Sequence, residues 1–238
     1  MNRKNEKILG VIGGMGPLAS QLFYRMIIEK TDAGCDQEHI DMIILNHASM
    51  PDRTEAILKG DTDEIFRLMK KDVRYLKEGG ADLIVMTCNT AHNLLCQLQE
   101  KTDVEILDMI DTAASHLADL GTKKAGILAT DGTVRDGLYQ KACDKYGIQP
   151  VLPSEEMQKK VMEIIYDGVK DGGPLNKEDI LPIEKEMKEK GCDRILMACT
   201  ELSCFMYQFG LDGIYVDAME VVAEKAIEKS GKKLKGKK

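Results

Sequence analysis

The chain has 238 residues, of which 43% are hydrophobic and 31% are charged, a composition typical of a soluble globular protein. This composition excludes wholesale disorder, and the length suffices for one large α/β unit or for two domains of about 100 to 120 residues each. The formal net charge is −7, although a lysine-rich end at 231–238 carries five positive charges. The acidic body argues against nucleic acid as a partner, because phosphate binding needs a basic surface.

The sequence also argues against a membrane or secreted setting. Its apolar runs are too short to cross a bilayer, and the glycine-rich stretch 8–19 is interpreted as a strand and its turn, not as a signal peptide. Seven cysteines, an odd number, do not form a compact disulfide framework. We therefore expect a cytoplasmic protein without a membrane partner, and we expect 231–238 to be a solvated, frayed tail.

The predicted elements alternate between apolar strands and helix-period segments, which is typical of parallel βαβ units. In the first half we expect strands at 8–12, 41–46, 83–86 and 105–107, and helices at 18–30, 65–76 and 90–98. In the second half we expect strands at 125–129 and 194–198, and helices at 134–146, 157–169, 177–190 and 218–228.

An internal repeat indicates that these two halves are alike. Residues 79–90 align with residues 190–201, so that Cys88 falls on Cys199, and a looser match joins 10–17 to 126–133. The predicted fold is therefore α/β, with two similar domains that each hold a mainly parallel sheet flanked by helices and are related by pseudo-twofold symmetry. The expected domains are 1–110, completed by a C-terminal helix at 212–230, and 111–211.

Cys88 and Cys199 are the first candidates for chemistry. Each is expected where a strand ends and a helix starts, a place where free backbone N–H groups and the helix dipole stabilise a thiolate. Taken alone, each fits a buried apolar cysteine better. The repeat and the polar neighbours favour a functional pair, and two thiols can lie on opposite faces of one carbon, as inversion by proton transfer requires.

Further candidates gather beyond the carboxyl ends of the strands, where open parallel sheets bind ligands. The hydroxyl and amide donors are Asn89, Thr90, Thr130, Thr133 and Thr200, which are equally suited to helix capping. Arg53 is either a fork for a substrate carboxylate or a partner of Asp52 in a surface ion pair. Glu201 is expected to orient Cys199 or to bind a substrate ammonium.

Lys160 lies within the apolar stripe of its predicted helix, so its ammonium either snorkels outward or points into the crevice at an anion; Lys159 is one position away. His47 and His92 make a weak metal signal, and His92 is expected to brace its helix. The glycines at 10–16 depart from the dinucleotide-binding order, but the loop carrying Met15 and Gly16 can wrap a small carboxylate.

Four motifs occur in order along nearly the whole chain, and together they are specific: Gly-Gly-Met-Gly-Pro at 13–17, Pro-Asp-Arg-Thr at 51–54, Thr-Cys-Asn-Thr-Ala-His at 87–92 and Ala-Cys-Thr-Glu-Leu at 198–202. With them the chain resembles the aspartate/glutamate racemase superfamily, and within it the aspartate racemase branch. Glu201 stands where the glutamate racemase branch tends to have a histidine, which weighs against a specialised glutamate racemase.

The resemblance implies a site between two α/β domains, neither pyridoxal phosphate nor a metal, and a homodimer. It implies that Cys88 and Cys199 act as two bases on the α-proton, that Arg53 binds a carboxylate, and that a lysine near Lys160 binds a side-chain carboxylate. The expected activity is cofactor-independent interconversion of L- and D-aspartate. A broad-specificity amino-acid racemase is the nearest alternative, and a thiol redox switch or ligand-binding module is a distant one.

Overall fold

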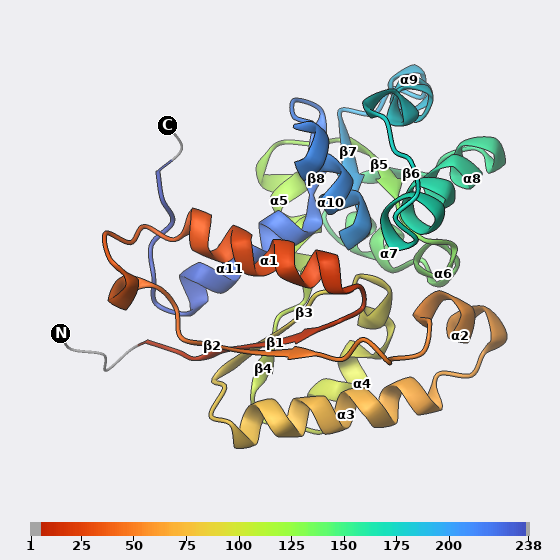
Figure 1. Cartoon of the computed structure of the whole chain (residues 1–238). Coiled ribbons are helices and arrows are strands. Elements are labelled where there is room, and N and C mark those ends of the chain that lie inside the picture. Colours follow the sequence, from red (N-terminus) through yellow and green to blue (C-terminus); the bar gives the residue numbers. More distant parts are fainter. Residues whose placement is uncertain (1–5, 237–238) are drawn as a thin grey trace.

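The computed structural model describes residues 6–236, so Lys237 and Lys238 of the predicted tail lie outside the described part of the chain (Figure 1). Two four-stranded sheets have equivalent strand orders, β2-β1-β3-β4 and β6-β5-β7-β8, and every pairing is parallel. The strands are β1 (Leu9–Gly13), β2 (Met42–Asn46), β3 (Leu83–Met86), β4 (Glu105–Ile106), β5 (Lys124–Leu128), β6 (Gln149–Val151), β7 (Arg194–Met197) and β8 (Tyr215–Asp217). The predicted fold of two similar α/β halves is confirmed.

Helices cover both faces of each sheet. The α-helices are α1 (Pro17–Lys30), α2 (Arg53–Lys59), α3 (Asp63–Glu78), α4 (Leu95–Gln99), α5 (Met109–Asp119), α6 (Asp131–Asp136), α7 (Leu138–Lys145), α8 (Glu155–Glu163), α9 (Leu181–Glu189), α10 (Thr200–Phe209) and α11 (Ala218–Lys229). Short 3₁₀ turns are η1 (Asp36–Glu38), η2 (Thr90–Leu94) and η4 (Lys177–Ile180), and η3 (Ile164–Lys170) is a π-helix. Among the described helices, none is long and apolar enough to span a membrane.

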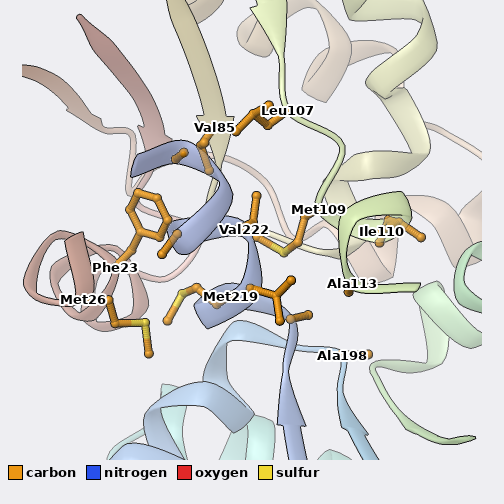
Figure 2. Close-up of a cluster of buried hydrophobic side chains, with 14 of the residues drawn as sticks. Phe23, Met26, Val85, Leu107, Met109, Ile110, Ala113, Ala198, Met219 and Val222 are labelled. Atoms are coloured by element: carbon orange, nitrogen blue, oxygen red, sulfur yellow. The ribbon is translucent and has the colours of Figure 1, made fainter. Parts of the chain in front are cut away.

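One hydrophobic core joins the two sheets. Helix α11 packs between them against α1 and α5, and Figure 2 shows Met219 and Val222 of α11 beside Phe23 of α1 and Met109 of α5. Residues of both sheets belong to the same cluster. Because burial of one such side chain contributes about 1.5–3 kcal/mol, the last helix stabilises both halves at once.

The outer face of each sheet has its own cover. The stripe predicted on α3 is buried against the first sheet, with Ile65, Met69, Val73 and Leu76 nearly inaccessible. Helices α8 and α9 cover the outer face of the second sheet. The two sheets therefore face one another across α1, α5 and α11, and their strand ends meet at one side of the molecule (Figure 1).

Two glycines that the repeat aligns let helices approach the sheets closely. A Cβ atom on Gly10 of β1 would lie 2.9 Å from the Cβ of Ala81, in the turn between α3 and β3, and 3.2 Å from Cδ1 of Leu76 on α3. A Cβ atom on Gly126 of β5 would lie 2.8 Å from the sulfur of Met187 on α9. The aligned glycines thus have the same packing reason in both halves.

The structure differs from the sequence prediction at the end of the chain. The described part of the lysine-rich end is docked, because Leu234 forms an antiparallel bridge with Thr31 and the Lys235 amide donates to Lys30 O at 2.7 Å. The expectation of a frayed tail is therefore wrong for these residues. Strand β8 pairs with β7, so the chain leaves the second sheet after Asp217 and not at 211.

Candidate active site

The two cysteines aligned by the repeat occupy equivalent places. Cys88 follows β3 and precedes η2, and Cys199 follows β7 and is the N-cap residue of α10. Both are nearly buried, with 5% and 4% of their surface exposed. The two thiols therefore stand at the carboxyl ends of the central strands of the two sheets.

Cys199 is bound to a buried carboxylate. Its Sγ donates to Glu201 Oε2 at 3.0 Å, and the Thr200 hydroxyl donates to the same oxygen at 3.2 Å. Burial, and next the charge of Glu201, raise the pKa of Cys199 well above its usual value. At neutral pH this side chain is a thiol that holds its proton.

Cys88 has a cation beside it. Arg53, the first residue of α2, is 8% exposed, and its guanidinium donates to Pro51 O at 2.8 Å and to Met15 O at 3.1 Å. Burial opposes the charged form, yet the pKa of Arg53 is raised, and the neighbouring Cys88 side chain makes the largest favourable contribution. Arg53 thus faces inward at the thiol and not outward in a surface ion pair.

A cavity of about 280 Å³, a small volume for a ligand pocket, opens beside Arg53 and Glu201, the neighbours of the two cysteines, and neither thiol lines it directly. Arg53, Met15 and Gly16 line it from the first half, and Lys170 and Glu201 line it from the second half. A Cβ atom on Gly16 would lie 3.4 Å from Glu201 Oε1, so the loop places its backbone next to that carboxylate. The two halves meet across the cavity with charges of both signs.

Three polar atoms of predicted site residues have no hydrogen-bond partner within residues 6–236. Arg53 Nε and Asn89 Nδ2 are buried donors, and Glu201 Oε1 is a buried acceptor with an ion-pair contact of 3.4 Å to Lys170 Nζ. Buried polar groups are nearly always hydrogen-bonded, which makes such atoms informative. Together they match a small molecule that carries both an anionic and a cationic group.

Three of the four predicted threonine donors meet in one cluster. The hydroxyl oxygens of Thr90, Thr130 and Thr133 lie 3.0 to 3.1 Å from one another, and all three residues are buried. Thr90 comes from the first half, whereas Thr130 and Thr133 come from the second. Thr130 also caps α6, so helix capping and convergence of the halves occur together.

Asn89, the residue after Cys88, is also contacted from the opposite half. The hydroxyl of Tyr139 on α7 donates to Asn89 Oδ1, and the tyrosine is fully buried. A second tyrosine of that half, Tyr166 of η3, reaches the first half at a different residue: its hydroxyl donates to the Asp52 carboxylate at 3.2 Å. Neither tyrosine was predicted, since the sequence places them on helix faces with no polar partner nearby in the chain.

The lysine at the cavity is Lys170 and not Lys160. Lys160 lines a separate cavity of about 430 Å³ with Glu163 and Asp167, and Lys159 lines a third one. The predicted helix 157–169 changes to a π-helix after Glu163, which alters the angular spacing of side chains. Lys160 lies in the regular helix α8 and faces the separate cavity, whereas Lys170 is the last residue of the π-helix and faces Glu201.

His92 braces the Cys88 loop. Its Nε2 accepts from the Met109 amide at 3.2 Å, so its Nδ1–H donates to Cys88 O at 2.9 Å. Burial lowers the pKa of His92, which keeps the ring neutral in this tautomer. Among the described residues, no group of three or more His, Cys, Asp or Glu side chains is placed to hold a metal.

Two known racemases match this chain in sequence. A broad specificity amino-acid racemase of Bacillus subtilis is 24% identical over 224 residues, which cover 92% of this chain and 96% of the relative. A glutamate racemase of Aquifex aeolicus is 27% identical over 143 residues, which cover 58% of this chain and 53% of the relative.

Solved structures agree. An aspartate racemase from Picrophilus torridus superposes with a TM-score of 0.84 at 32% identity, covering 96% of each chain. An aspartate racemase homologue from Pyrococcus horikoshii superposes with a TM-score of 0.76 at 24% identity, covering 94% of this chain and 99% of that one, a likeness of fold alone. The family model described as Asp/Glu/hydantoin racemase matches residues 12–226. The resemblance noted in the motifs is thereby confirmed, and this chain belongs to the Asp/Glu/hydantoin racemase family and is a racemase.

Proposed function

We propose that this racemase interconverts L- and D-aspartate without a cofactor, by two-base proton transfer between Cys88 and Cys199. The observation that carries the proposal is the placement of one thiol from each half beside one charged network, with Arg53 next to Cys88 and Glu201 next to Cys199. A racemase must exchange hydrogen on both faces of one carbon. Two sulfur atoms supplied by equivalent places of two similar halves suit that task.

The unpaired polar atoms match the groups of an amino acid. We assign the α-carboxylate to Arg53 Nε and Asn89 Nδ2, and the α-ammonium to Glu201 Oε1. Lys170, which takes the role predicted for Lys160, is assigned to the side-chain carboxylate. Charge-assisted hydrogen bonds of this kind are about twice as strong as neutral ones, so an acidic amino acid fits the cavity best.

In the proposed cycle one cysteine starts each turnover as a thiolate and the other as a thiol, and the roles reverse; in the direction described next, Cys88 is the thiolate and Cys199 the thiol. The Cys88 thiolate removes the α-proton from one face, and the Cys199 S–H delivers its proton to the opposite face. One Cα–H bond breaks and another forms, and the thiolate moves from Cys88 to Cys199. The intermediate carbanion is costly, and each ~1.4 kcal/mol of stabilisation from fixed donors speeds the reaction about tenfold.

A broad-specificity racemase is the second candidate. The Bacillus subtilis relative of that name matches nearly the whole chain. The Lys170 ammonium is already paired with Glu201, which offsets part of its charge toward a substrate side chain. A panel of amino acids in heavy water, with deuterium uptake at Cα as the measurement, separates the two candidates. Aspartate is expected to exchange fastest, and faster exchange of a neutral amino acid contradicts the substrate assignment.

Serine replacements test the two-base scheme. Cys88→Ser and Cys199→Ser are each expected to abolish racemisation of both enantiomers, whereas Cys96→Ser, at an exposed cysteine, leaves the rate unchanged. A rate within a few-fold of the parent in either variant contradicts the scheme. A reversible Cys88–Cys199 disulfide that governs function, detected by thiol titration after mild oxidation, would support a redox switch instead.

We also propose that the protein is a homodimer in the cytoplasm. Sedimentation tests the homodimer, and cell fractionation tests the location.

A further inference from the structure

We infer that Tyr139 is a positioning residue that fixes the Asn89 side-chain amide from the opposite half of the molecule, so that its NH₂ group faces the substrate. The inference rests on the proposed function, in which Asn89 binds the α-carboxylate. It adds a residue that neither the motifs nor the repeat singles out. It depends on one buried hydrogen bond between α7 and the loop after Cys88.

The environment of Tyr139 makes its hydroxyl a fixed donor. Its side chain is fully buried in the core shared by both halves. Burial, and next the charges of Asp108 and Asp217, raise the pKa of the phenol well above its usual value. The hydroxyl therefore keeps its proton and needs an acceptor, and Asn89 Oδ1 is that acceptor.

This bond determines which way the amide points. A side-chain amide has one acceptor oxygen and two N–H donors. With Oδ1 held by Tyr139, the Nδ2 group is turned away from the phenol, and it is buried with no hydrogen-bond partner in the described chain. Turning the amide over would take the acceptor away from the phenolic proton, which carries the cost of an unpaired buried donor.

The fixed amide has a catalytic value that an unrestrained one lacks. Asn89 is the residue that follows Cys88 in the chain, so its oriented N–H donor lies close to the place where the negative charge of the carbanion grows. Such a donor needs no reorientation during the reaction. A second contact between the halves, from Asn93 to Asp136, lies one helical turn further on and does not involve the unpaired amide. It provides a control for the general docking of the halves.

The kinetic test removes the hydroxyl and keeps the ring. Tyr139→Phe is expected to lower kcat/KM for aspartate about 10- to 100-fold, less than the roughly 100- to 1,000-fold found when an oriented donor is removed outright, because Asn89 keeps its amide. Tyr146→Phe, which removes a hydroxyl bonded to Asp111 beyond the end of the same helix, and Asn93→Ala are each expected to stay within about twofold of the parent.

A double-mutant cycle separates positioning from a general structural effect. If Tyr139 acts through Asn89, then Tyr139→Phe costs nothing more once Asn89 has been replaced by alanine. Equal losses in the presence and absence of Asn89 overturn the inference. So does a loss in Asn93→Ala as large as that in Tyr139→Phe, because it would assign the effect to docking of the halves.

Spectroscopy gives a result that does not depend on activity. The parent protein and both variants are labelled with ¹⁵N-asparagine, and their Asn89 side-chain amide signals are compared. Relative to the parent, the signal is expected to shift in Tyr139→Phe and to stay in place in Tyr146→Phe. The Tyr139 hydroxyl proton of the parent protein should exchange slowly and lose its signal pattern in Asn89→Ala. Unchanged signals overturn the role of Tyr139, whereas a parent protein that racemises no amino acid overturns the proposed function.

Discussion

His92 and Ser203 each stand four residues after one of the two candidate cysteines, Cys88 and Cys199, and each reaches the helix that follows the last strand of its own sheet. His92 accepts from the Met109 amide at the start of α5, and the Ser203 hydroxyl donates to Asp217, the N-cap residue of α11, at 2.6 Å. The repeat therefore extends to the supports of the thiols. In the first half the histidine itself titrates, whereas in the second half the serine does not and its partner Asp217 does.

The support at His92 makes folding stability depend on pH. The pKa of His92 is lowered in the folded state, so the unfolded chain takes up the proton first, near its ordinary value of about 6.5. Stability is fully present above that pH and is lost as the pH falls, by at most ~1.4 kcal/mol per pH unit. His92→Gln should be about 1–3 kcal/mol less stable at pH 8, with a smaller deficit at pH 5. Urea unfolding at both pH values is the measurement, and a constant deficit contradicts the expectation.

Asp217 makes folding stability depend on pH in the opposite direction to His92. Burial raises its pKa to about 6, above the ordinary value near 3.9, so the folded protein binds the proton more tightly than the unfolded chain. That stabilisation is present below 3.9 and is lost as the pH rises to about 6.

Asp217→Asn should therefore gain stability relative to the parent between pH 4 and pH 7, by up to about 3 kcal/mol. Its Oδ1 can still accept from Ser203 and from the Met219 amide, and asparagine caps helices as well as aspartate does. Thermal or urea unfolding across this pH range is the measurement. A relative stability that falls between pH 4 and pH 7 is the contrary outcome.

Glu201 is expected to control the protonation of Cys199. Its charge contributes, after burial, to the raised pKa of that thiol. Glu201→Gln should therefore lower the pKa of Cys199, move the alkaline limb of the pH–rate profile to lower pH, and raise KM through loss of the ammonium partner. Ultraviolet absorbance of the thiolate during a pH titration is the measurement. Glu163→Gln, next to the separate cavity of Lys160, is the control, and an unmoved profile in Glu201→Gln counts against the role.

The two lysines can be told apart by substrate. Lys170→Ala is expected to reduce kcat/KM for aspartate by about 10- to 100-fold, mostly through KM, because a charged hydrogen bond to the side-chain carboxylate is lost. The loss of kcat/KM with free alanine as the substrate should be smaller, because alanine has no side-chain carboxylate. Lys160→Ala should leave aspartate racemisation within about twofold of the parent. A larger loss in Lys160→Ala than in Lys170→Ala would restore the assignment made from helical periodicity.

The repeat and the apolar runs predicted the fold well, for a physical reason. Central strands of parallel sheets are buried on both faces, so segments such as 83–86 and 194–197 are continuously apolar and end abruptly at polar residues. The residues at those ends are therefore recognisable, which is why the sequence singles out Cys88, Cys199 and the threonines of the cluster as candidates. Short edge strands such as β6 and β8 carry no such signal and were missed.

The errors come from helices that change their geometry. Gly137, in a left-handed conformation with φ of 67°, divides the predicted helix 134–146 into α6 and α7, and this break places Tyr139 toward Asn89. The π-helix does the same for Lys170. Tyr139 then contacts Asn89 of the other half, whereas Lys170 contacts Glu201 of its own half, and local periodicity encodes neither contact.

The position of α11 has a consequence for the order in which the enzyme is made. This helix follows all eight described strands in the chain, and it supplies Met219 and Val222 to the centre of the core that both sheets share. A nascent chain that ends before 218 therefore exposes the inner faces of both sheets, however completely their strands have been synthesised. The two halves that carry Cys88 and Cys199 are thus expected to pack together only once α11 has been synthesised, and a chain that stops before this helix is expected to aggregate.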